Sequence, residues 1–389
     1  MNNNSKICLD KDRTSKKKKT KNDEKVINIS LLNKKHKIGK KDLIKEDINN
    51  KTNKSNNPKN IEFLKDLTNN SYSLGTNNSF CVFKSINDIL YLIYSDEDIS
   101  IISYNIVDNK IINKIKNSHI KYIINFRHYL DINNNRDLLL SSDYNNLKLW
   151  DVNNFGCLLI INDINKKGFL FSTSFIYDND QIFILTTNYI VGGISEPMKV
   201  YDMKGNKIKE INDPYQKNSA LLIEVYYDIK LKKVYIIVGS TYCIKSYEFN
   251  ENKIYNYYID DNIDGENHIN FTINNDKEII KLIDANERGI IRIWDFHLKI
   301  LLSKITTKNN LNSICLWDND YLFLGTRNNF IILIDLKKGK IIKRMKGHNN
   351  RVSTIRKITH PIYGNCLISQ GLELNNIKLW VIKNISNGK

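Results

Sequence analysis

The stretch that decides the fold runs from Gly347 to Val381 and reads GHNNRVSTIRKITHPIYGNCLISQGLELNNIKLWV. It opens on a Gly-His pair and closes on an apolar run that carries Trp380. Two further apolar runs and a turn-rich gap lie between these ends. A unit of this size that recurs along a chain is the mark of a repeat architecture, so the next question is whether it recurs.

The end of this stretch recurs six more times. Each copy is a four-residue apolar run, usually closed by an aromatic side chain: Ile101–Tyr104, Leu147–Trp150, Met198–Tyr201, Ile244–Tyr247, Ile291–Trp294, Ile331–Ile334 and Ile377–Trp380. The last residues of successive runs are separated by 46, 51, 46, 47, 40 and 46 positions. Seven copies at nearly constant spacing predict seven structural repeats.

Each run is followed by a turn and preceded by another apolar segment. The residue after the run is acidic or an amide in six copies, and Gly205 and Gly339 then supply the positive φ that a tight turn needs. The preceding segments are short and apolar at consecutive positions, as strands covered on both faces are. They are Ile89–Ile93, Leu138–Leu140, Ile182–Leu185, Val234–Val238, Ile279–Ile283, Tyr321–Leu324 and Cys366–Ile368.

These features resemble the WD40-repeat family over about residues 60–385. Trp150-Asp151 and Trp294-Asp295 match the dipeptide that names the family, and Gly347-His348 matches its Gly-His. The resemblance implies an all-β fold: a seven-bladed β-propeller of four-stranded antiparallel blades. The other repeats carry Tyr or Ile where the family has Trp, so the match rests on count and spacing.

The resemblance also implies a buried hydrogen-bond network of His, Ser or Thr, Asp and Trp in each blade. Blade seven offers His348, Ser369 and Trp380, with Leu374 near the place of the Asp. Blade two offers His119, Ser142, Asp143 and Trp150. Blade five offers His268 and Trp294 without a clear Asp.

In the family, an N-terminal strand closes the ring by completing the last blade. Only nine residues follow Trp380 here, too few and too polar to form another strand. We therefore expect Ile61–Leu67 to be the outer strand of blade seven. On this model, deleting residues 1–58 leaves a cooperative fold, whereas deleting residues 1–75 opens the ring.

Residues 1–59 differ from the rest of the chain. Residues 1–60 hold 18 Lys and Arg against 7 Asp and Glu, a net charge of +11, whereas the other 329 residues have a net charge of +6. We expect a disordered Lys/Asn-rich tail, because so polar a segment buries too little to offset chain entropy. Such a tail either is a solvated arm or binds phosphate backbones such as RNA.

The remaining composition gives no sign of a catalytic or metal site. The six cysteines stand singly in the sequence, and no histidines have metal-ligand spacing. We find no nucleophile elbow, phosphate loop or zinc-protease motif, and we expect no enzyme and no cofactor. The chain has no apolar run that could be a signal peptide or a membrane span. We expect a cytoplasmic protein, with the basic run 15–21 as an indication of nuclear import.

What remains is a binding surface. Loops that join successive blades, and the hairpins between second and third strands, share one face of a propeller. Arg288, Arg327, Lys346 and Arg351 fall on that face in blades five to seven. Such a cluster suits an acidic or phosphorylated peptide, and solvated loop charge is the alternative.

The sequence therefore predicts a non-catalytic protein-interaction scaffold within a larger assembly. The alternative is a nucleic-acid-associated factor, nuclear or in ribosome assembly, that uses the basic tail. A phosphoinositide reader is disfavoured, since Phe126–Tyr129 departs from the Phe-Arg-Arg-Gly motif. A ubiquitin-ligase receptor is disfavoured too, since Asn153 and His297 replace the Arg of W-D-x-R.

Overall fold

The computed structural model describes residues 57–68, 71, 79–162, 168–190, 197–212, 222–240, 243–251, 253–260, 268–275, 279–372 and 377–382. The chain divides into two units, Met1–Lys54 and Ser55–Lys389, and all of the described residues belong to the second. The predicted disordered tail lies outside the described residues up to position 56.

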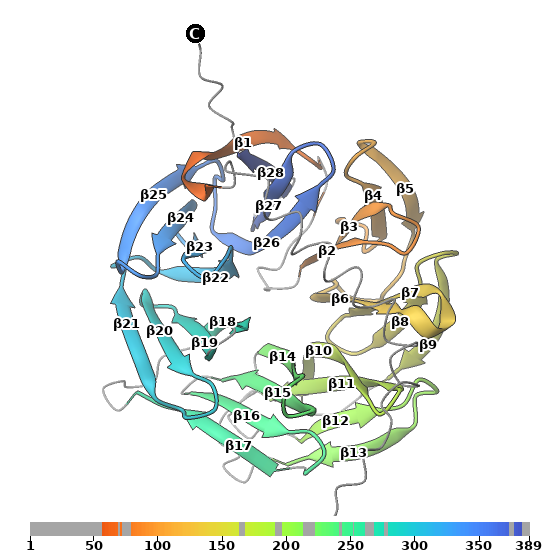
Figure 1. Ribbon diagram of the computed structural model, residues 1–389. Coiled ribbons are helices and arrows are strands. Elements are labelled where there is room, and N and C mark those ends of the chain that lie inside the picture. The colour runs from red at the N-terminus through yellow and green to blue at the C-terminus, as the bar shows by residue number, and fades with distance from the viewer. Residues whose placement is uncertain are drawn as a thin grey trace, which may run out of the picture. The chain divides into compact units, whose positions relative to one another are not determined.

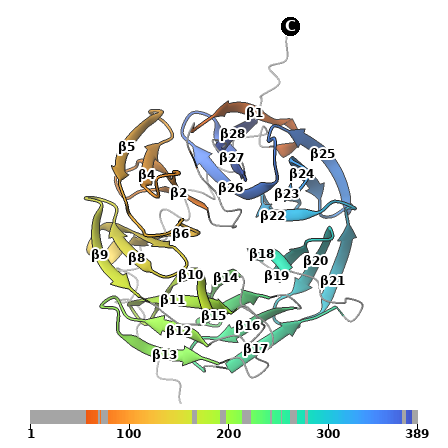
Figure 2. The ribbon, with the colours of Figure 1, turned by 180° about the vertical axis from the view of Figure 1, so that it is seen from behind.

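The second unit is a ring of seven four-stranded antiparallel sheets, shown from its two sides in Figures 1 and 2. Blade one consists of β2 (Phe80–Lys84), β3 (Leu90–Ser95), β4 (Ile101–Asn105) and β5 (Lys110–Ile115). Blade two consists of β6 (Asn125–Asp131), β7 (Arg136–Ser142), β8 (Leu147–Asp151) and β9 (Gly156–Ile161). Blade three consists of β10 (Gly168–Asp178), β11 (Gln181–Ile190), β12 (Met198–Tyr201) and β13 (Lys207–Ile211). Blades four and five are β14 (Leu222–Asp228), β15 (Lys233–Gly239), β16 (Ile244–Glu248), β17 (Lys253–Tyr258); and β18 (His268–Asn275), β19 (Ile280–Asn286), β20 (Ile290–Asp295), β21 (Leu301–Thr306). Blades six and seven are β22 (Leu311–Leu316), β23 (Tyr321–Thr326), β24 (Phe330–Asp335), β25 (Lys340–Lys346); and β26 (Val352–His360), β27 (Gly364–Gly371), β28 (Ile377–Ile382), β1 (Ile61–Asp66).

The predicted seven-bladed propeller, closed by an N-terminal strand, is confirmed. The seven recurring runs are the third strands of the blades, and the seven segments before them are the second strands. The second strands are almost wholly buried, as in β3 and β23, because each blade is covered by a neighbour on either side. The first strands lie innermost, and each contacts the first strands of both neighbouring blades.

Every blade carries an irregularity where its third and outer strands pair. In all seven blades the register shifts immediately before the last residue of the recurring run, for example between Leu149 and Trp150. The extra residue lies in the outer strand, as Leu158 does in blade two and Leu64 in blade seven. A bulge puts two residues of one strand opposite one of its partner and bends the strand. The repeated bulge therefore bends each outer strand at the same position of the repeat.

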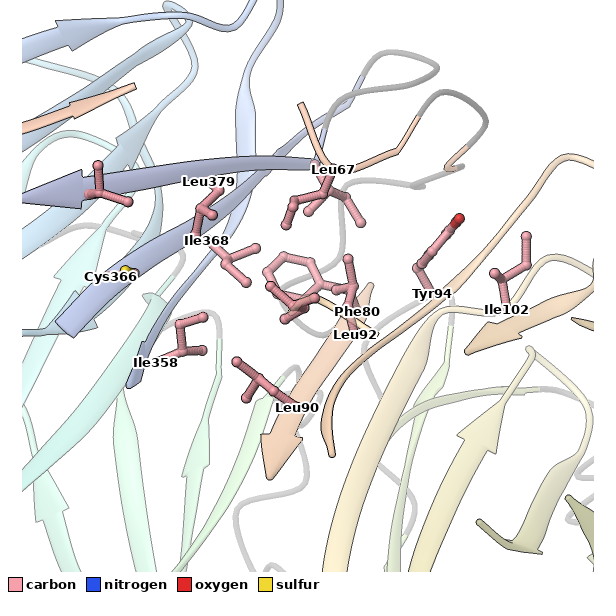
Figure 3. Packing of buried hydrophobic residues seen from close by; sticks show 13 residues of the cluster. Leu67, Phe80, Leu90, Leu92, Tyr94, Ile102, Ile358, Cys366, Ile368 and Leu379 are labelled. Carbon is pink, nitrogen blue, oxygen red and sulfur yellow. The ribbon is translucent and has the colours of Figure 1, made fainter. Parts of the chain in front are cut away.

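Strand β1 pairs antiparallel with β28 and completes blade seven, as predicted, although it ends at Asp66 rather than Leu67. Ile61 is fully buried against blades six and seven, and Leu67 packs at the seam between blades seven and one. Figure 3 shows this seam, where Phe80 and Leu92 of blade one meet Ile368 and Leu379 of blade seven. The ring thus closes through an apolar core shared by residues from both ends of the chain.

Polar side chains on the first strands tie neighbouring blades together. The Asn125 side-chain amide donates to Thr173 Oγ1 at 2.7 Å, joining blades two and three. Asn312 Nδ2 donates to the Val352 carbonyl at 3.1 Å, joining blades six and seven. At the closing seam Ser79 Oγ donates to Gln370 Oε1 at 2.5 Å. The three donor side chains are buried, and each finds an acceptor across the blade boundary.

Candidate functional site

The order of the strands gives the ring two distinct faces. One face, which we call the linker face, carries the loops between blades and the hairpins between second and third strands. The other, the tip face, carries the hairpins between first and second and between third and outer strands. This assignment follows from the antiparallel pairing of consecutive strands in each sheet.

Blade two contains a complete buried network. Ser141 Oγ accepts a hydrogen bond from Trp150 Nε1 at 2.8 Å and lies 2.7 Å from His119 Nε2. His119 Nδ1 lies 3.4 Å from Asp143 Oδ2, and Asp143 accepts the backbone amides of Asn145 and Asn146 at 2.7 Å each. The serine is Ser141 and not Ser142, because Ser141 pairs with Lys148 and so lies on the same sheet face as Trp150.

Burial lowers the pKa of His119, and the Asp143 carboxylate offsets part of this shift. The network thus holds the linker before blade two against the blade's own third strand. Ser141 holds the histidine at Nε2, and the Asp143 carboxylate faces its Nδ1.

Blade seven repeats the arrangement. His348 Nε2 lies 2.7 Å from Ser369 Oγ, which accepts from Trp380 Nε1 at 2.8 Å. Burial, with Lys378 adding to it, lowers the pKa of His348 to about 3, so this imidazole is neutral. A Cβ on Gly347 would come within 2.6 Å of the Trp380 ring, which is why glycine precedes the histidine. Leu374, considered at the place of the Asp, lies outside the described residues.

Blade five has an acidic residue and an arginine at the positions that Ser141 and Lys148 occupy in blade two. Asp284 pairs in register with Arg292, just as Ser141 pairs with Lys148 in blade two. Asp284 Oδ1 lies 3.0 Å from Arg292 Nε, and Asp284 Oδ2 accepts from Trp294 Nε1 at 2.6 Å. The side chain of His268, which begins β18, lies outside the described residues. Sequence reasoning missed Asp284, which an alignment of strands by register would have placed at the serine position.

The acidic residue after each Trp has a structural role. Asp151 Oδ1 accepts the amide of Asn153 at 2.8 Å, and Asp295 Oδ1 accepts the amides of His297 and Leu298 at 3.0 and 2.8 Å. These carboxylates close the turn to the outer strand by satisfying its first amides. The described repeat-motif residues therefore stabilise the blades.

The four basic residues singled out from the sequence all lie on the linker face. Arg288, Arg327 and Lys346 are exposed, and Arg351 is half-buried. Arg327 reaches Glu287 at 2.8 Å across the boundary of blades five and six. Burial lowers the pKa of Arg351, and the nearby Arg327 adds to the shift while Glu287 opposes it. Arg327, Arg351 and Glu287 thus form one electrostatic cluster, and Glu287 is a member that sequence reasoning missed.

A second group of charges lies on the inner strands, and it too was missed. Arg127 of β6 donates to the Ile223 carbonyl at 2.7 Å and reaches Glu224 at 3.0 Å, so it braces blade two against blade four. Arg356 of β26 is half-buried; desolvation lowers its pKa, and Arg127 adds to this effect. The signal available in the sequence was an arginine inside a strand segment, Arg127 in β6 and Arg356 in β26.

The thiols next to Arg356 are held protonated. Burial raises the pKa of Cys81 and of Cys315 to about 11. A thiol is a poor nucleophile and metal ligand unless it ionises. Within the described ranges, no group of three or more His, Cys, Asp or Glu could hold a metal ion.

Comparison with known proteins supports the fold alone. No family model matches the chain, and no curated protein matches its sequence. Among solved structures, it is similar to Raptor of Chaetomium thermophilum, with a TM-score of 0.61 and 13% identity. The match covers 82% of this chain and 29% of that one. Because identity is this low, the likeness shows a shared propeller architecture and carries no activity across.

The described helices also bear on membrane topology. None of them has the length and apolar character to cross a bilayer.

Proposed function

We propose that this protein is a non-catalytic interaction scaffold of the WD40-repeat type, and that the linker face of blades five to seven binds an acidic or phosphorylated peptide. Arg351 carries the proposal. Its Nε is buried and, among the described residues, has no hydrogen-bond partner, while Arg327 stands close enough to depress its pKa. A buried donor without a partner costs free energy that an anionic ligand would recover.

The rest of the site supports the same ligand chemistry. Arg288 and Lys346 are exposed beside the cluster, and a phosphate between Arg327 and Arg351 would relieve their mutual repulsion. Glu287 already pairs with Arg327, so it competes with an incoming anion while it also holds that guanidinium in place. The site therefore favours a ligand that carries more than one negative charge.

The test uses a fluorescent acidic peptide in phosphorylated and unphosphorylated forms, titrated against the full-length chain by anisotropy. We expect Arg327→Ala and Arg351→Ala each to weaken binding of the phosphorylated form by about 10-fold or more, because a charge-assisted hydrogen bond contributes about 1.5–3 kcal/mol. Glu287→Gln should strengthen binding, since it removes the competing carboxylate. Both effects also follow the net charge, so an arginine away from this site is needed to separate a specific site from general basicity.

Arg136→Ala is the matched control, because Arg136 lies on the tip face and is paired with Asp131 at 2.9 Å. Equal losses for Arg136→Ala and Arg351→Ala would show that the peptide follows the net charge and not this site.

RNA binding by the tail is the second candidate, supported by the net charge of +11 in residues 1–60. It predicts a steep dependence of RNA affinity on salt that disappears when residues 1–56 are removed. The linker-face variants should leave that dependence unchanged.

A further inference from the structure

Two neighbouring turns of the tip face expose the same pattern, an apolar residue on each side of a lysine. The first is Ile229–Leu231, between β14 and β15, where Ile229 is 80% and Leu231 51% exposed. The second is Leu298–Ile300, between β20 and β21, where Leu298 is 63% and Ile300 54% exposed. Lys230 and Lys299 stand between them and are exposed. We call these two triplets the paired tips.

A close polar contact joins the two tips. Asp228 precedes the first triplet and His297 precedes the second, and Asp228 Oδ2 lies 2.9 Å from His297 Nε2. The other ring nitrogen of His297 lies 3.1 Å from the Tyr255 hydroxyl. Since the anchoring residues adjoin the triplets, the four exposed apolar side chains belong to one patch that spans blades four and five.

Each tip also has a fixed backbone. Asp228 Oδ1 accepts the amides of Lys230 and Leu231 at 2.9 Å each, and Asp295 Oδ1 accepts those of His297 and Leu298. The apolar side chains are thus presented to solvent by ordered turns. The two carboxylates face inward, both being at least nine-tenths buried, so the charge that the triplets display outward is that of their lysines.

We propose that the paired tips bind an anionic lipid surface, with the four apolar side chains entering the headgroup region and the lysines contacting lipid phosphates. Apolar residues alternating with lysine have this amphipathic character, and each basic residue near such a surface contributes about 1 kcal/mol. The exposed fractions of the four apolar side chains show that they protrude from the surface. A bilayer deforms around protrusions, whereas a protein partner would need a separate pocket for each tip.

Other hairpins on the same face supply an internal comparison. Ile132 and Ile362 are 65% and 70% exposed at the first hairpins of blades two and seven. Ile132 is flanked by Asp131 and Asn133, and Ile362 by Pro361 and Tyr363. Neither has a lysine beside it or a second apolar turn bonded to it. Exposure of isoleucine is therefore common to the face, but its combination with lysine in two joined turns distinguishes blades four and five.

The experiment measures cosedimentation of the full-length chain with phosphatidylcholine vesicles, with and without phosphatidylserine. The double variant Ile229→Asn with Leu298→Asn keeps the net charge, so the basic tail contributes equally to it and to the unmodified chain. We expect the double variant to lose about 10-fold or more in partitioning onto anionic vesicles, since burying such a side chain contributes about 1.5–3 kcal/mol when complete. Lys299→Gln should lose about fivefold, on anionic vesicles alone.

Ile362→Asn is the matched control and should partition like the unmodified chain. All four of these residues are exposed, so equal unfolding midpoints will show that the variants remain folded. The proposal is overturned if the unmodified chain does not bind anionic vesicles, if the double variant binds as well as the unmodified chain, or if Ile362→Asn loses as much.

A second measurement locates the contact. A polarity-sensitive dye on Ile229→Cys, in a chain with Cys8→Ser and Cys157→Ser, should shift to the blue when anionic vesicles are added. The same dye on Ile362→Cys should not shift. Sedimentation without a shift at position 229 would assign lipid binding to another part of the chain and would overturn the assignment to the paired tips.

Discussion

At the scale of single residues, the repeats keep the hydrogen bond from the third-strand Trp, but the residue that accepts it changes. Ser141 and Ser369 accept a hydrogen bond from the indole of a third-strand Trp, and in blade five Asp284 accepts the corresponding bond. A buried carboxylate needs a counter-charge, and Arg292, which is 1% exposed, supplies it from the adjacent strand. The change of Ser to Asp is therefore coupled to a change of Lys to Arg two positions before the Trp.

This coupling predicts an asymmetric response to mutation. Asp284→Ala should lower the free energy of unfolding by about 3–5 kcal/mol, because it leaves Arg292 buried without its counter-charge. The double variant Asp284→Leu with Arg292→Leu should recover most of that loss. Urea unfolding of the full-length chain measures all three proteins.

Ser141→Ala is the comparison, since it removes neutral hydrogen bonds that contribute only about 1 kcal/mol each. If Asp284→Ala proves no more costly than Ser141→Ala, the ion pair does not carry the stability assigned to it.

At the scale of elements, the outer strands differ in how their open edges are protected. Six of the seven described outer strands contain at least one lysine, whereas β9 reads GCLLII and contains no charged residue. Leu158 and Ile160 are about half exposed on it. Charged side chains on an edge strand oppose pairing with another chain. Strand β9 is therefore the edge least protected against aggregation.

Adding a charge to β9 should reduce aggregation. We expect Leu158→Lys to raise the temperature at which light scattering begins, with little change in the unfolding midpoint, because the side chain is exposed. Ile208→Lys is the matched control on β13, which already carries Lys207 and Lys209. Equal effects of the two substitutions would point to net charge, and no effect of Leu158→Lys would show that aggregation starts elsewhere.

At the scale of the whole molecule, the ring depends on one short strand far from its partner in sequence. Strand β1 covers the edge of β28, and Phe63 meets the Trp380 ring edge-on at 5.7 Å. Lys343 of blade six donates to the Ile61 carbonyl at 2.6 Å, so β1 also ties blade seven to blade six. Without β1 the last blade would lose its outer strand and both contacts.

Truncation tests this closure. Deleting residues 1–56 removes no described strand and should leave the unfolding midpoint unchanged; the cut falls here and not after position 58 because Pro58 is buried. Deleting residues 1–75 removes β1 and should lower the midpoint by about 5 °C or more, since each kcal/mol shifts the midpoint of a large domain by about 2–4 °C. Equal midpoints by calorimetry would rule out the role given to β1.

The sequence by itself determined the number of blades, the four-strand pattern and the identity of the closing strand. It did so because nearby residues encode both the strands that are buried on two faces and the turns that follow them. The same residue pattern therefore appears in every repeat. It also indicated the side of the ring on which Arg327 and Arg351 lie, since strand order alone assigns a loop to a face.

Only the tertiary structure decided which of these side chains meet. Asp284 meets Arg292 through the strand register within blade five, whereas Glu287 with Arg327 and Asp228 with His297 meet through the packing of neighbouring blades. In the sequence these residues look like ordinary turn or strand positions, because strand register and blade packing choose their partners. The paired tips share this origin, since the two turns meet through the packing of blade four against blade five.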